Sequence, residues 1–264
     1  MKDNPSSVTV LTAIEESIGT ITLNHGRVNA LSKRLIDDIC AALEQMRSES
    51  VQVVILRALN GAKVFSAGHD VKELPTNGRD PLTYGDPLRH AVRTIETHPA
   101  PIIAMVEGSV WGGACELVMG CDLVVAASDA TFALTPAKLG IPYNLSGMLN
   151  FLKVGGIHLI KEMLFTAQPV AAGRLAAAGV INHVVPAEGL ESFTLALAKR
   201  ITETSPLVHR ILKEELRVLA NAHPLNPEAY ERIQSLRREV YDSNDYQEGI
   251  RAFFEKRKPE FHGR

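Results

Sequence analysis

Apolar residues follow strand periodicity at the start of the chain and then change to helix periodicity. Two β-rich runs, 8–15 and 18–24, lie on either side of Glu16 and Ser17 and predict a β-hairpin. Behind Ser32, a residue type that caps helix N-termini, apolar residues recur at helical spacing and predict an amphipathic helix. The apolar face of that helix is formed by Leu35, Ile36, Ile39, Leu43 and Met46.

Short apolar runs bounded by turn residues alternate with helical patterns in the middle of the chain. The runs at 51–58, 101–106 and 122–127 are nearly continuous in apolar character, as is typical of strands buried on both faces. The fold class predicted from this alternation is α/β.

From about Gly189 onward the pattern becomes wholly helical. The predicted helices cover 207–219, 227–241 and 246–258 and are separated at Pro224 and at 242–244. We therefore expect two parts, an α/β core over residues 1–188 and a C-terminal helical region over residues 189–264.

Composition narrows the class of protein. The 264 residues, 45% of them hydrophobic, suffice for one large core or two modest ones. Lys and Arg number 28 against 30 Asp and Glu, so no basic excess favours a nucleic acid partner. The N-terminal MKDNPSSVTV has no apolar signal region, and no window approaches the roughly 18 apolar residues of a membrane span, which predicts a cytoplasmic protein.

The three cysteines do not indicate a metal or redox site. Cys40, Cys115 and Cys121 lack the paired spacing of zinc and disulfide-exchange motifs. We expect buried free thiols and no bound metal.

Two glycine-containing segments are the best candidates for chemistry, because the sequence has no GxGxxG, Walker, HExxH or GxSxG motif. In EGSVWGGACEL, residues 107–117, an apolar strand ends at Gly112 and Gly113 and a helix begins. Free N–H groups at a helix start, beside glycines that admit close approach, suit an oxyanion. The same glycines would also suit tight strand-to-helix packing. In FSAGHDVKEL, residues 65–74, His69 stands between a glycine and an aspartate.

Together and in this order, the two segments resemble the signature segments of the crotonase, or enoyl-CoA hydratase/isomerase, superfamily. The resemblance extends over nearly the whole chain, including LN at 23–24 and NAL at 29–31 near the start and FFEKRKP at the end. It implies a crotonase-like spiral of ββα units, followed by a helical region that assembles a homotrimer or a dimer of trimers. In that family each segment donates one backbone N–H to the thioester carbonyl of a coenzyme A substrate. By position, the donors are the amides of His69 and Gly113, which leaves the His69 imidazole without an assigned role.

The choice of reaction depends on the acids near the thioester. Family hydratases activate water with two glutamates, of which the first matches Glu116 and the second falls at Ala137, so water addition is not expected. The segments SVWGGA, TPAKLGIPYNLSG, KEELRVL and RREVYDSNDYQEG resemble the branch of the family that decarboxylates methylmalonyl-CoA to propionyl-CoA and CO2. Loss of CO2 delivers electrons into the thioester without a general base. The resemblance implies that Tyr143 orients the substrate carboxylate beside an apolar wall that includes Trp111.

Glu116 has two interpretations from the sequence. It either protonates the enolate or is held in an ion pair by Arg89 or Arg93. The residues that the resemblance implies for substrate binding are Ala67, Lys72, Trp111, Arg27, Val28 and, from a neighbouring subunit, Phe253 and Lys256. No biotin-carrier motif or metal cluster occurs, so we expect no cofactor other than the coenzyme A of the acyl-CoA substrate.

Two other functions stay open at this point. One is a different crotonase-type acyl-CoA enzyme, such as a hydratase, an isomerase or an acyl-CoA hydrolase. The other is a non-catalytic or RNA-binding homologue. A binder of RNA would need a lysine-rich outward helix, whereas residues 32–49 carry more acidic than basic side chains, which argues against it.

Overall fold

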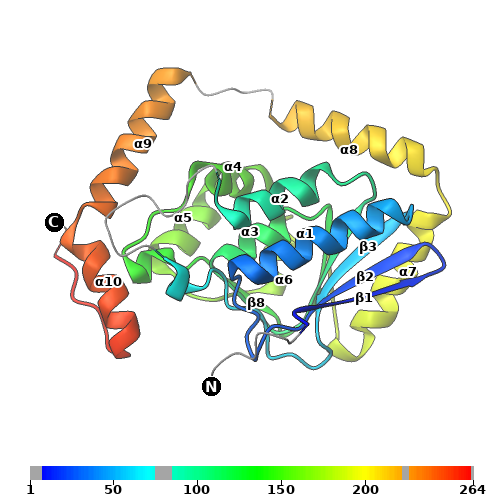
Figure 1. The fold of residues 1–264 in the computed structure, drawn as a ribbon, viewed down its shortest axis with the longest axis horizontal. Coiled ribbons are helices and arrows are strands. Elements are labelled where there is room, and N and C mark those ends of the chain that lie inside the picture. Colours follow the sequence, from blue (N-terminus) through cyan, green and yellow to red (C-terminus); the bar gives the residue numbers. More distant parts are fainter. Residues whose placement is uncertain (1–7, 75–84, 222–225, 263–264) are drawn as a thin grey trace.

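The computed structural model describes residues 8–74, 85–221 and 226–262. The first half of the chain repeats a unit of two strands followed by a helix (Figure 1). The elements of these units are β1 (Val10–Glu15), β2 (Ile18–Leu23) and α1 (Lys33–Ser48); β3 (Val53–Ala58), β4 (Val64–Ser66) and α2 (Pro87–Thr97); β5 (Ile102–Val106), β6 (Ser109–Trp111) and α3 (Gly113–Met119); β7 (Leu123–Ala127), β8 (Thr131–Ala133) and α4 (Leu145–Val154). Two short 3-10 helices, η1 (Val71–Glu73) and η2 (Pro136–Leu139), follow β4 and β8.

The strands form two sheets. The first sheet has the order β1-β2-β3-β5-β7-β10 and the second has the order β4-β6-β8-β9. The β1–β2 hairpin and the β8–β9 pair are antiparallel, and the other neighbours are parallel. From β3 to β8, each unit therefore places its first strand in one sheet and its second strand in the other, and the chain advances as a spiral. This arrangement confirms the α/β class and the crotonase-like spiral expected from the sequence.

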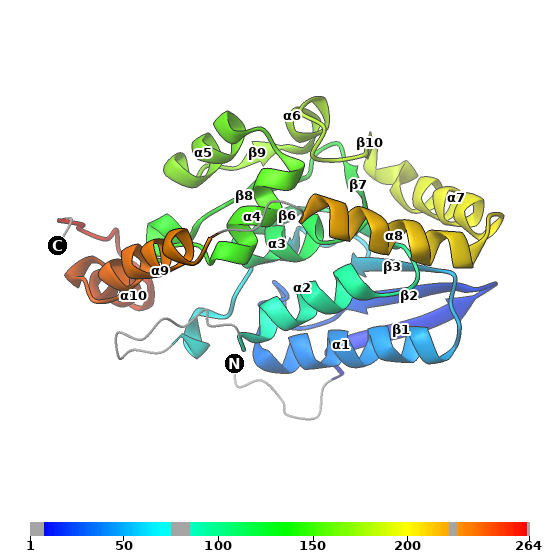
Figure 2. The same cartoon turned by 90° about the horizontal axis from the view of Figure 1, so that it is seen from above.

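The remaining elements complete the core and then leave it. They are α5 (Ile157–Thr166), β9 (Val170–Ala171), α6 (Ala172–Ala177), β10 (His183–Val185), η3 (Ala187–Gly189), α7 (Leu190–Thr202), α8 (Pro206–Ala220), α9 (Pro227–Tyr241) and α10 (Asn244–Glu255). Helix α7 packs against β3, β5 and β7, with Leu190 and Ala198 in the main core. In Figure 1, α8 lies along the upper right of the molecule and α9 and α10 descend on its left. Figure 2 shows α1 and α2 side by side, with α7 apart from them and next to the strands of the first sheet.

The local predictions agree well with the structure. Ser32 caps α1 by accepting a hydrogen bond from the Leu35 amide, and the predicted apolar face of α1 is buried. Helix α10 ends earlier than predicted, because Lys256 adopts a left-handed backbone conformation (φ 55°) and stops the helix. Pro224 lies outside the described residues, and the division at residue 188 stays a prediction.

A small second core fastens the C-terminal helices beside the end of η1. It consists of Leu74, Ile141, Tyr241, Tyr246 and Ile250. Helix α10 also packs closely on η2, since a side chain on Gly249 would collide with the backbone of Leu139. This core therefore attaches α9 and α10 to the loops that follow β4 and β8.

Two further observations bear on the sequence predictions. Cys115 and Cys121 are buried free thiols, and Cys40 is a partly buried one. Within the three described ranges, no helix combines the length and the apolar character needed to cross a membrane.

Candidate active site

Two glycine turns meet at one edge of the second sheet. Strands β4 and β6 are parallel neighbours, so the turns that follow them, at Gly68 and at Gly112, leave the sheet at the same edge. Gly68 has φ +81°, and a Cβ atom there would lie 2.4 Å from the Trp111 carbonyl oxygen and 3.0 Å from the Gly113 nitrogen. Only glycine satisfies both the left-handed conformation and this close backbone approach.

The contact between the turns brings two main-chain donors together. The position that a Cβ atom of Gly113 would occupy is 3.6 Å from the His69 nitrogen. Gly113 is the first residue of α3, where backbone N–H groups have no partner within the helix. Neither the His69 amide nor the Gly113 amide donates a hydrogen bond to any residue that the structure describes. Two adjacent free N–H groups are the arrangement that an oxyanion hole requires.

The register of the His69 segment is held by its neighbour in the first unit. Leu31 donates its N–H to the Gly68 carbonyl at 2.8 Å, and its own carbonyl accepts from the Asp70 amide at 3.3 Å. These bonds fix the residues on either side of His69 and leave the amide of His69 to a ligand.

A cavity of about 440 Å³ opens beside the two donors. Its lining includes most of the residues predicted from the sequence, which are Val28, Ala67, His69, Trp111, Gly113, Glu116, Tyr143 and Phe253. The cavity is not lined by the predicted cations Arg27, Lys72 and Lys256. Arg27 directly precedes the lining residue Val28, and Lys72 lies two residues after the lining residue Asp70. The structure therefore brings most of the predicted residues together, but not the predicted cations.

Glu116 is the most buried acid of the cavity. Its side chain is 1% exposed, and Oε2 accepts a hydrogen bond from Asn144 Nδ2 at 3.3 Å. Oε1 is buried and has no hydrogen-bond partner among the described residues. Burial raises the pKa of Glu116 from 4.5 to about 7, with Asp86 and Glu96 adding to the rise and Asn144 and Arg89 opposing it. At neutral pH this carboxyl group is therefore protonated in a large fraction of molecules.

The ion pair considered for Glu116 does not form within the described structure. No cation of the described residues lies within 4.0 Å of Glu116, and Arg89 instead donates to the Ser146 hydroxyl. The Arg89 charge still acts on Glu116 through space. Of the two interpretations from the sequence, the geometry favours the one in which Glu116 exchanges a proton.

Tyr143 presents a second buried polar atom to the cavity. It follows η2 through Ile141 and Pro142, and its side chain is 9% exposed. Its hydroxyl oxygen has no hydrogen-bond partner in the part of the chain that the structure describes. Burial raises the pKa of Tyr143 well above its ordinary value of 10.0, helped by Cys115 and Glu116, so the hydroxyl stays protonated and can donate a hydrogen bond.

His69 and Trp111 complete the predicted set. The imidazole Nδ1 of His69 is buried without a partner among the described residues. The indole of Trp111 is partly buried, and its Nε1 donates to the Ser109 hydroxyl at 2.8 Å, which fixes the ring at the cavity wall.

Phe253 reaches the cavity from its own chain. The family resemblance implies a contribution of Phe253 from a neighbouring subunit, which stays a prediction; in the single chain, Phe253 itself lines the site. The reason is the close packing of α10 on η2 and the small second core, which bring α10 back over the site.

Several lining residues were not assigned from the sequence, among them Leu88, Lys138 and Asn144. Leu88 lies over Gly113, with Cδ2 2.6 Å from the position of a Cβ atom there. Lys138 adds a cation to the lining, and Asn144 contacts Glu116. Leu88 and Lys138 carry no local signal, but Asn144 is a typical N-cap residue before the apolar pattern of α4.

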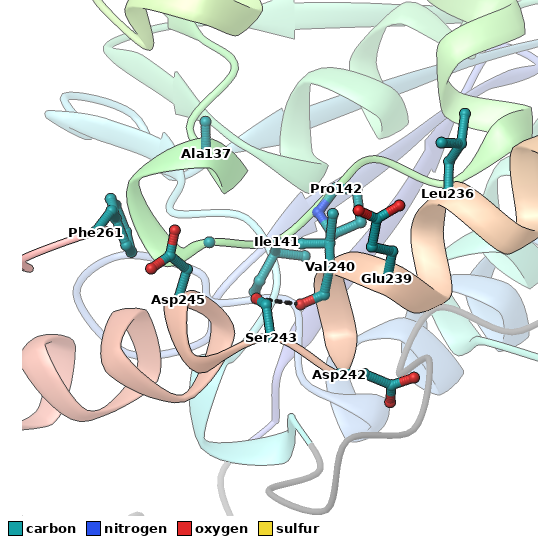
Figure 3. Close-up of a pocket in the computed structure, with 11 residues that line it drawn as sticks. Ala137, Ile141, Pro142, Leu236, Glu239, Val240, Asp242, Ser243, Asp245 and Phe261 are labelled. Carbon is teal, nitrogen blue, oxygen red and sulfur yellow. Dashed lines mark hydrogen bonds between the residues drawn. The ribbon is translucent and has the colours of Figure 1, made fainter. Parts of the chain in front are cut away.

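The position of the second family glutamate faces away from this cavity. Ala137 lines a separate pocket between η2 and α9, together with Glu239 and Asp245 (Figure 3). Ile141 lines both pockets and separates them. On η2, the residues that line the cavity of Glu116 are Pro136, Lys138 and Leu139, and Ala137 is not among them. Among the described lining residues, Glu116 and Asp70 are the only carboxylates.

Comparison with known proteins places the chain in a family. A family model described as enoyl-CoA hydratase/isomerase matches residues 13–264. The chain belongs to the enoyl-CoA hydratase/isomerase family. The spiral of two-strand units is thus the fold of a family member, as the sequence predicted.

Individual family members differ in how similar they are to this chain. A methylmalonyl-CoA decarboxylase of Escherichia coli (strain K12) is 55% identical over 247 residues, which are 93% of this chain and 95% of that protein. A probable enoyl-CoA hydratase of Bacillus subtilis (strain 168) is 29% identical over 257 residues, 95% of this chain and 97% of that protein. A solved methylmalonyl-CoA decarboxylase in complex with 2-nitronate-propionyl-CoA has a TM-score of 0.95 at 53% identity, covering 98% of this chain and 100% of that one.

Proposed function

We propose that this protein decarboxylates methylmalonyl-CoA to propionyl-CoA and CO2. The observation that carries the proposal is the group of buried polar atoms without partners among the described residues, namely Tyr143 Oη, Glu116 Oε1 and His69 Nδ1, around one cavity. Buried polar groups are almost always hydrogen-bonded in folded proteins, so such a group indicates a polar ligand. The 55% identity with the decarboxylase of Escherichia coli supports the choice of substrate.

The reaction begins with the thioester carbonyl between the His69 and Gly113 amides. The bond between Cα and the carboxylate breaks, its electron pair moves through Cα to the thioester oxygen, and CO2 leaves. Negative charge grows on that oxygen, so the two N–H groups bind the transition state more tightly than the substrate. Each such donor typically lowers the barrier by roughly 2.7–4 kcal/mol.

Tyr143 orients the carboxylate that leaves. Its protonated hydroxyl donates to the carboxylate and holds it out of the thioester plane, so that the breaking bond overlaps the carbonyl π system. The apolar side of Trp111 favours the charge-dispersed transition state over the localised carboxylate.

Glu116 completes the reaction by protonating Cα of the enolate. A carboxyl group with a pKa of about 7 is well matched to proton transfer near neutral pH. The ionised Glu116 then regains a proton from solvent. No cofactor takes part in this sequence beyond the coenzyme A of the substrate.

The coenzyme A moiety lies toward the rim of the cavity. Lys138 lines the cavity, and Lys72 and Arg27 lie within two residues of its lining, so these cations bind the phosphate groups. Val28 and Ala67 line the same cavity and contact the pantetheine or adenine portions. From helix α10, Phe253 covers these portions, and Lys256 follows at the end of the helix.

We propose that the chain assembles as a trimer, or as two stacked trimers, through its C-terminal helices. Helix α8 has no buried residue in the single chain. Its exposed apolar side chains are Leu207, Val208, Ile211, Leu212, Leu216, Val218 and Leu219. A stripe of this kind indicates a surface that a partner subunit covers.

A panel of four thioesters tests the proposed function. Malonyl-, methylmalonyl-, ethylmalonyl- and crotonyl-CoA are each incubated with the protein, and the products are identified by mass spectrometry. We expect propionyl-CoA and CO2 from methylmalonyl-CoA, and slow or no hydration of crotonyl-CoA, since the cavity offers no second glutamate among its described residues. Rapid hydration of crotonyl-CoA without release of CO2 from methylmalonyl-CoA would disprove the proposal.

A further inference from the structure

We infer that Asn144 is a positioning residue that determines which oxygen of Glu116 carries the proton delivered to the substrate. The inference rests on the proposed function and adds to it the direction from which Cα is protonated. No role for Asn144 follows from the family signatures described above.

The orientation of the Asn144 amide is set by the backbone of α4. Asn144 is 2% exposed and caps this helix, with its Oδ1 accepting from the Gly147 N–H at 2.7 Å. A backbone N–H can only donate, so the side-chain atom that faces it must be the oxygen. The Nδ2 group is therefore directed at Glu116, where it lies 3.3 Å from Oε2.

The amide nitrogen of Asn144 can only donate a hydrogen bond, so its contact with Oε2 determines which oxygen of neutral Glu116 carries the proton. The better acceptor of a protonated carboxyl group is its carbonyl oxygen, so Oε2 is the carbonyl oxygen and the proton lies on Oε1. Oε1 is the oxygen without a partner among the described residues, and Glu116 lines the cavity. The acidic proton is thus available to a substrate and not to the protein.

Gly147 lets the carboxyl group of Glu116 pack against the backbone of α4. A Cβ atom at Gly147 would lie 2.7 Å from Oε2 and 3.2 Å from Oε1, so the backbone of α4 is packed directly against the carboxyl group. The same helical turn provides the hydrogen bond through Asn144 and, at Gly147, a bare stretch of backbone on which the carboxyl group packs. These two contacts hold the carboxyl group of Glu116 in one orientation, so the position of Oε1 is fixed.

A fixed Oε1 predicts a stereochemical result. When the bond from Cα to the carboxylate breaks, CO2 leaves and a planar enolate remains in the site. In D2O, Oε1 of Glu116 then transfers a deuteron to Cα of this enolate. Because Oε1 lies on one side of the enolate, one enantiomer of 2-deuteriopropionyl-CoA should form. Solvent that reaches a poorly held enolate delivers deuterium to both faces.

The decisive variant is Asn144→Ser, which keeps a good N-cap acceptor and removes the amide donor. In D2O we expect the wild type to form one enantiomer in at least about tenfold excess, and the variant to form nearly equal amounts, since a hydrogen bond to a carboxyl group is lost. Asn144→Asp, which keeps the cap and the size of the side chain but removes the donor, should behave likewise. Circular dichroism checks that both variants fold.

Asn150 offers a matched control in the same helix. Its Nδ2 donates to Glu96 Oε1 at 3.0 Å, and it does not line the cavity. Asn150→Ser also replaces a buried asparagine bonded to a glutamate, and it should keep the wild-type enantiomeric excess.

The outcomes separate the positioning role from the proposed function. An unchanged enantiomeric excess in Asn144→Ser and Asn144→Asp, or equal amounts of both enantiomers from the wild type, would overturn the role of Asn144. If methylmalonyl-CoA releases no CO2, the proposed function fails instead. In that case the role of Asn144 is tested with propionyl-CoA in D2O, where wild-type protein should exchange one α-hydrogen selectively. Exchange without selectivity, or no exchange, would overturn the inference.

Discussion

The ring of Phe151 meets the ring of Tyr143 edge-on, with 5.0 Å between ring centroids and 86° between ring planes. Phe151 of α4 is fully buried, so packing holds the ring of Tyr143 in place. The hydroxyl group of Tyr143, in contrast, has no hydrogen-bond partner among the described residues. The ring and the hydroxyl therefore have separate roles, and one substitution distinguishes them.

Tyr143→Phe should lower kcat and leave the fold intact. The change keeps the ring and removes one donor, and a hydrogen bond to a charged group is worth about 1.5–3 kcal/mol, so kcat should fall roughly tenfold to a few hundredfold. Propionyl-CoA lacks the carboxylate and should bind both proteins equally, which calorimetry can measure. An equal loss of propionyl-CoA affinity would reduce Tyr143 to a packing residue.

The same variant should be at least as stable as the wild type. A buried hydroxyl without a partner destabilises the folded state, so its removal should leave the free energy of unfolding unchanged or raise it by about 1 kcal/mol. Urea denaturation measures this directly. A marked loss of stability would mean that the hydroxyl has a structural partner.

Gly68→Ala and His69→Ala should differ sharply although the residues are adjacent. A methyl group at Gly68 would lie 2.4 Å from the Trp111 carbonyl oxygen in a left-handed conformation, and it would push the two turns apart. Losing one oxyanion donor typically costs about 100- to 1,000-fold in kcat, and we expect a loss of that size. His69→Ala keeps the amide and should retain substantial activity. Losses above about a hundredfold in both variants would assign a role to the imidazole.

Glu116→Gln should change the pH dependence of stability. The pKa of Glu116 is raised from 4.5 to about 7, so its neutral form stabilises the folded protein below pH 4.5 and this contribution is lost as the pH rises to about 7. Glutamine cannot ionise, so the free energy of unfolding of the variant should rise relative to that of the wild type as the pH increases between these limits. The expected rise is up to about 3 kcal/mol, at about 1.4 kcal/mol per pKa unit. Asp86, Glu96, Arg89 and Tyr143 act on the same group but are present in both proteins. Urea titrations at about pH 5 and pH 8 measure the difference, and a constant gap would contradict the raised pKa.

The assembly can be tested on the outer face of α8. Leu216 and Leu219 are 66% and 68% exposed in the single chain, so a partner subunit is expected to cover them. Replacing both with aspartate would place two charges in an apolar interface, and light scattering should show the mass of a monomer. As a control, Glu215→Lys changes an exposed charge in the same helix and should leave the oligomer intact. A wild-type protein that is active as a monomer would rule the assembly out.

The fold class followed from the sequence because hydrophobic periodicity reports burial directly. The long strands β3, β5 and β7 and the helix α9 were expected close to their observed bounds. The second sheet was not, because β4, β6 and β8 have only 3 residues each and β9 has 2, which is too short for a period to appear. Their pairing depends on contacts between distant units.

The site shows the same division. The glycine turns and Glu116 could be singled out because they belong to local motifs around α3 and η1. Leu88 and Lys138 could not, because only tertiary packing brings α2 and η2 to the cavity. Phe253 lines the cavity because the small second core packs α10 against it. That core joins residues far apart in the sequence, such as Leu74 and Tyr246, so no local pattern predicts it.

The contact between Gly68 and the turn at Gly113 has a consequence for how such proteins diverge. A main-chain amide is present whatever side chain the residue carries. Substitutions at position 69 or in the walls of the acyl pocket therefore leave the oxyanion hole intact. New reactions can then arise by altering the acids and the walls alone. For the same reason, truncating the His69 side chain does not remove the group that binds the developing charge, whereas replacing that single amide with an ester would.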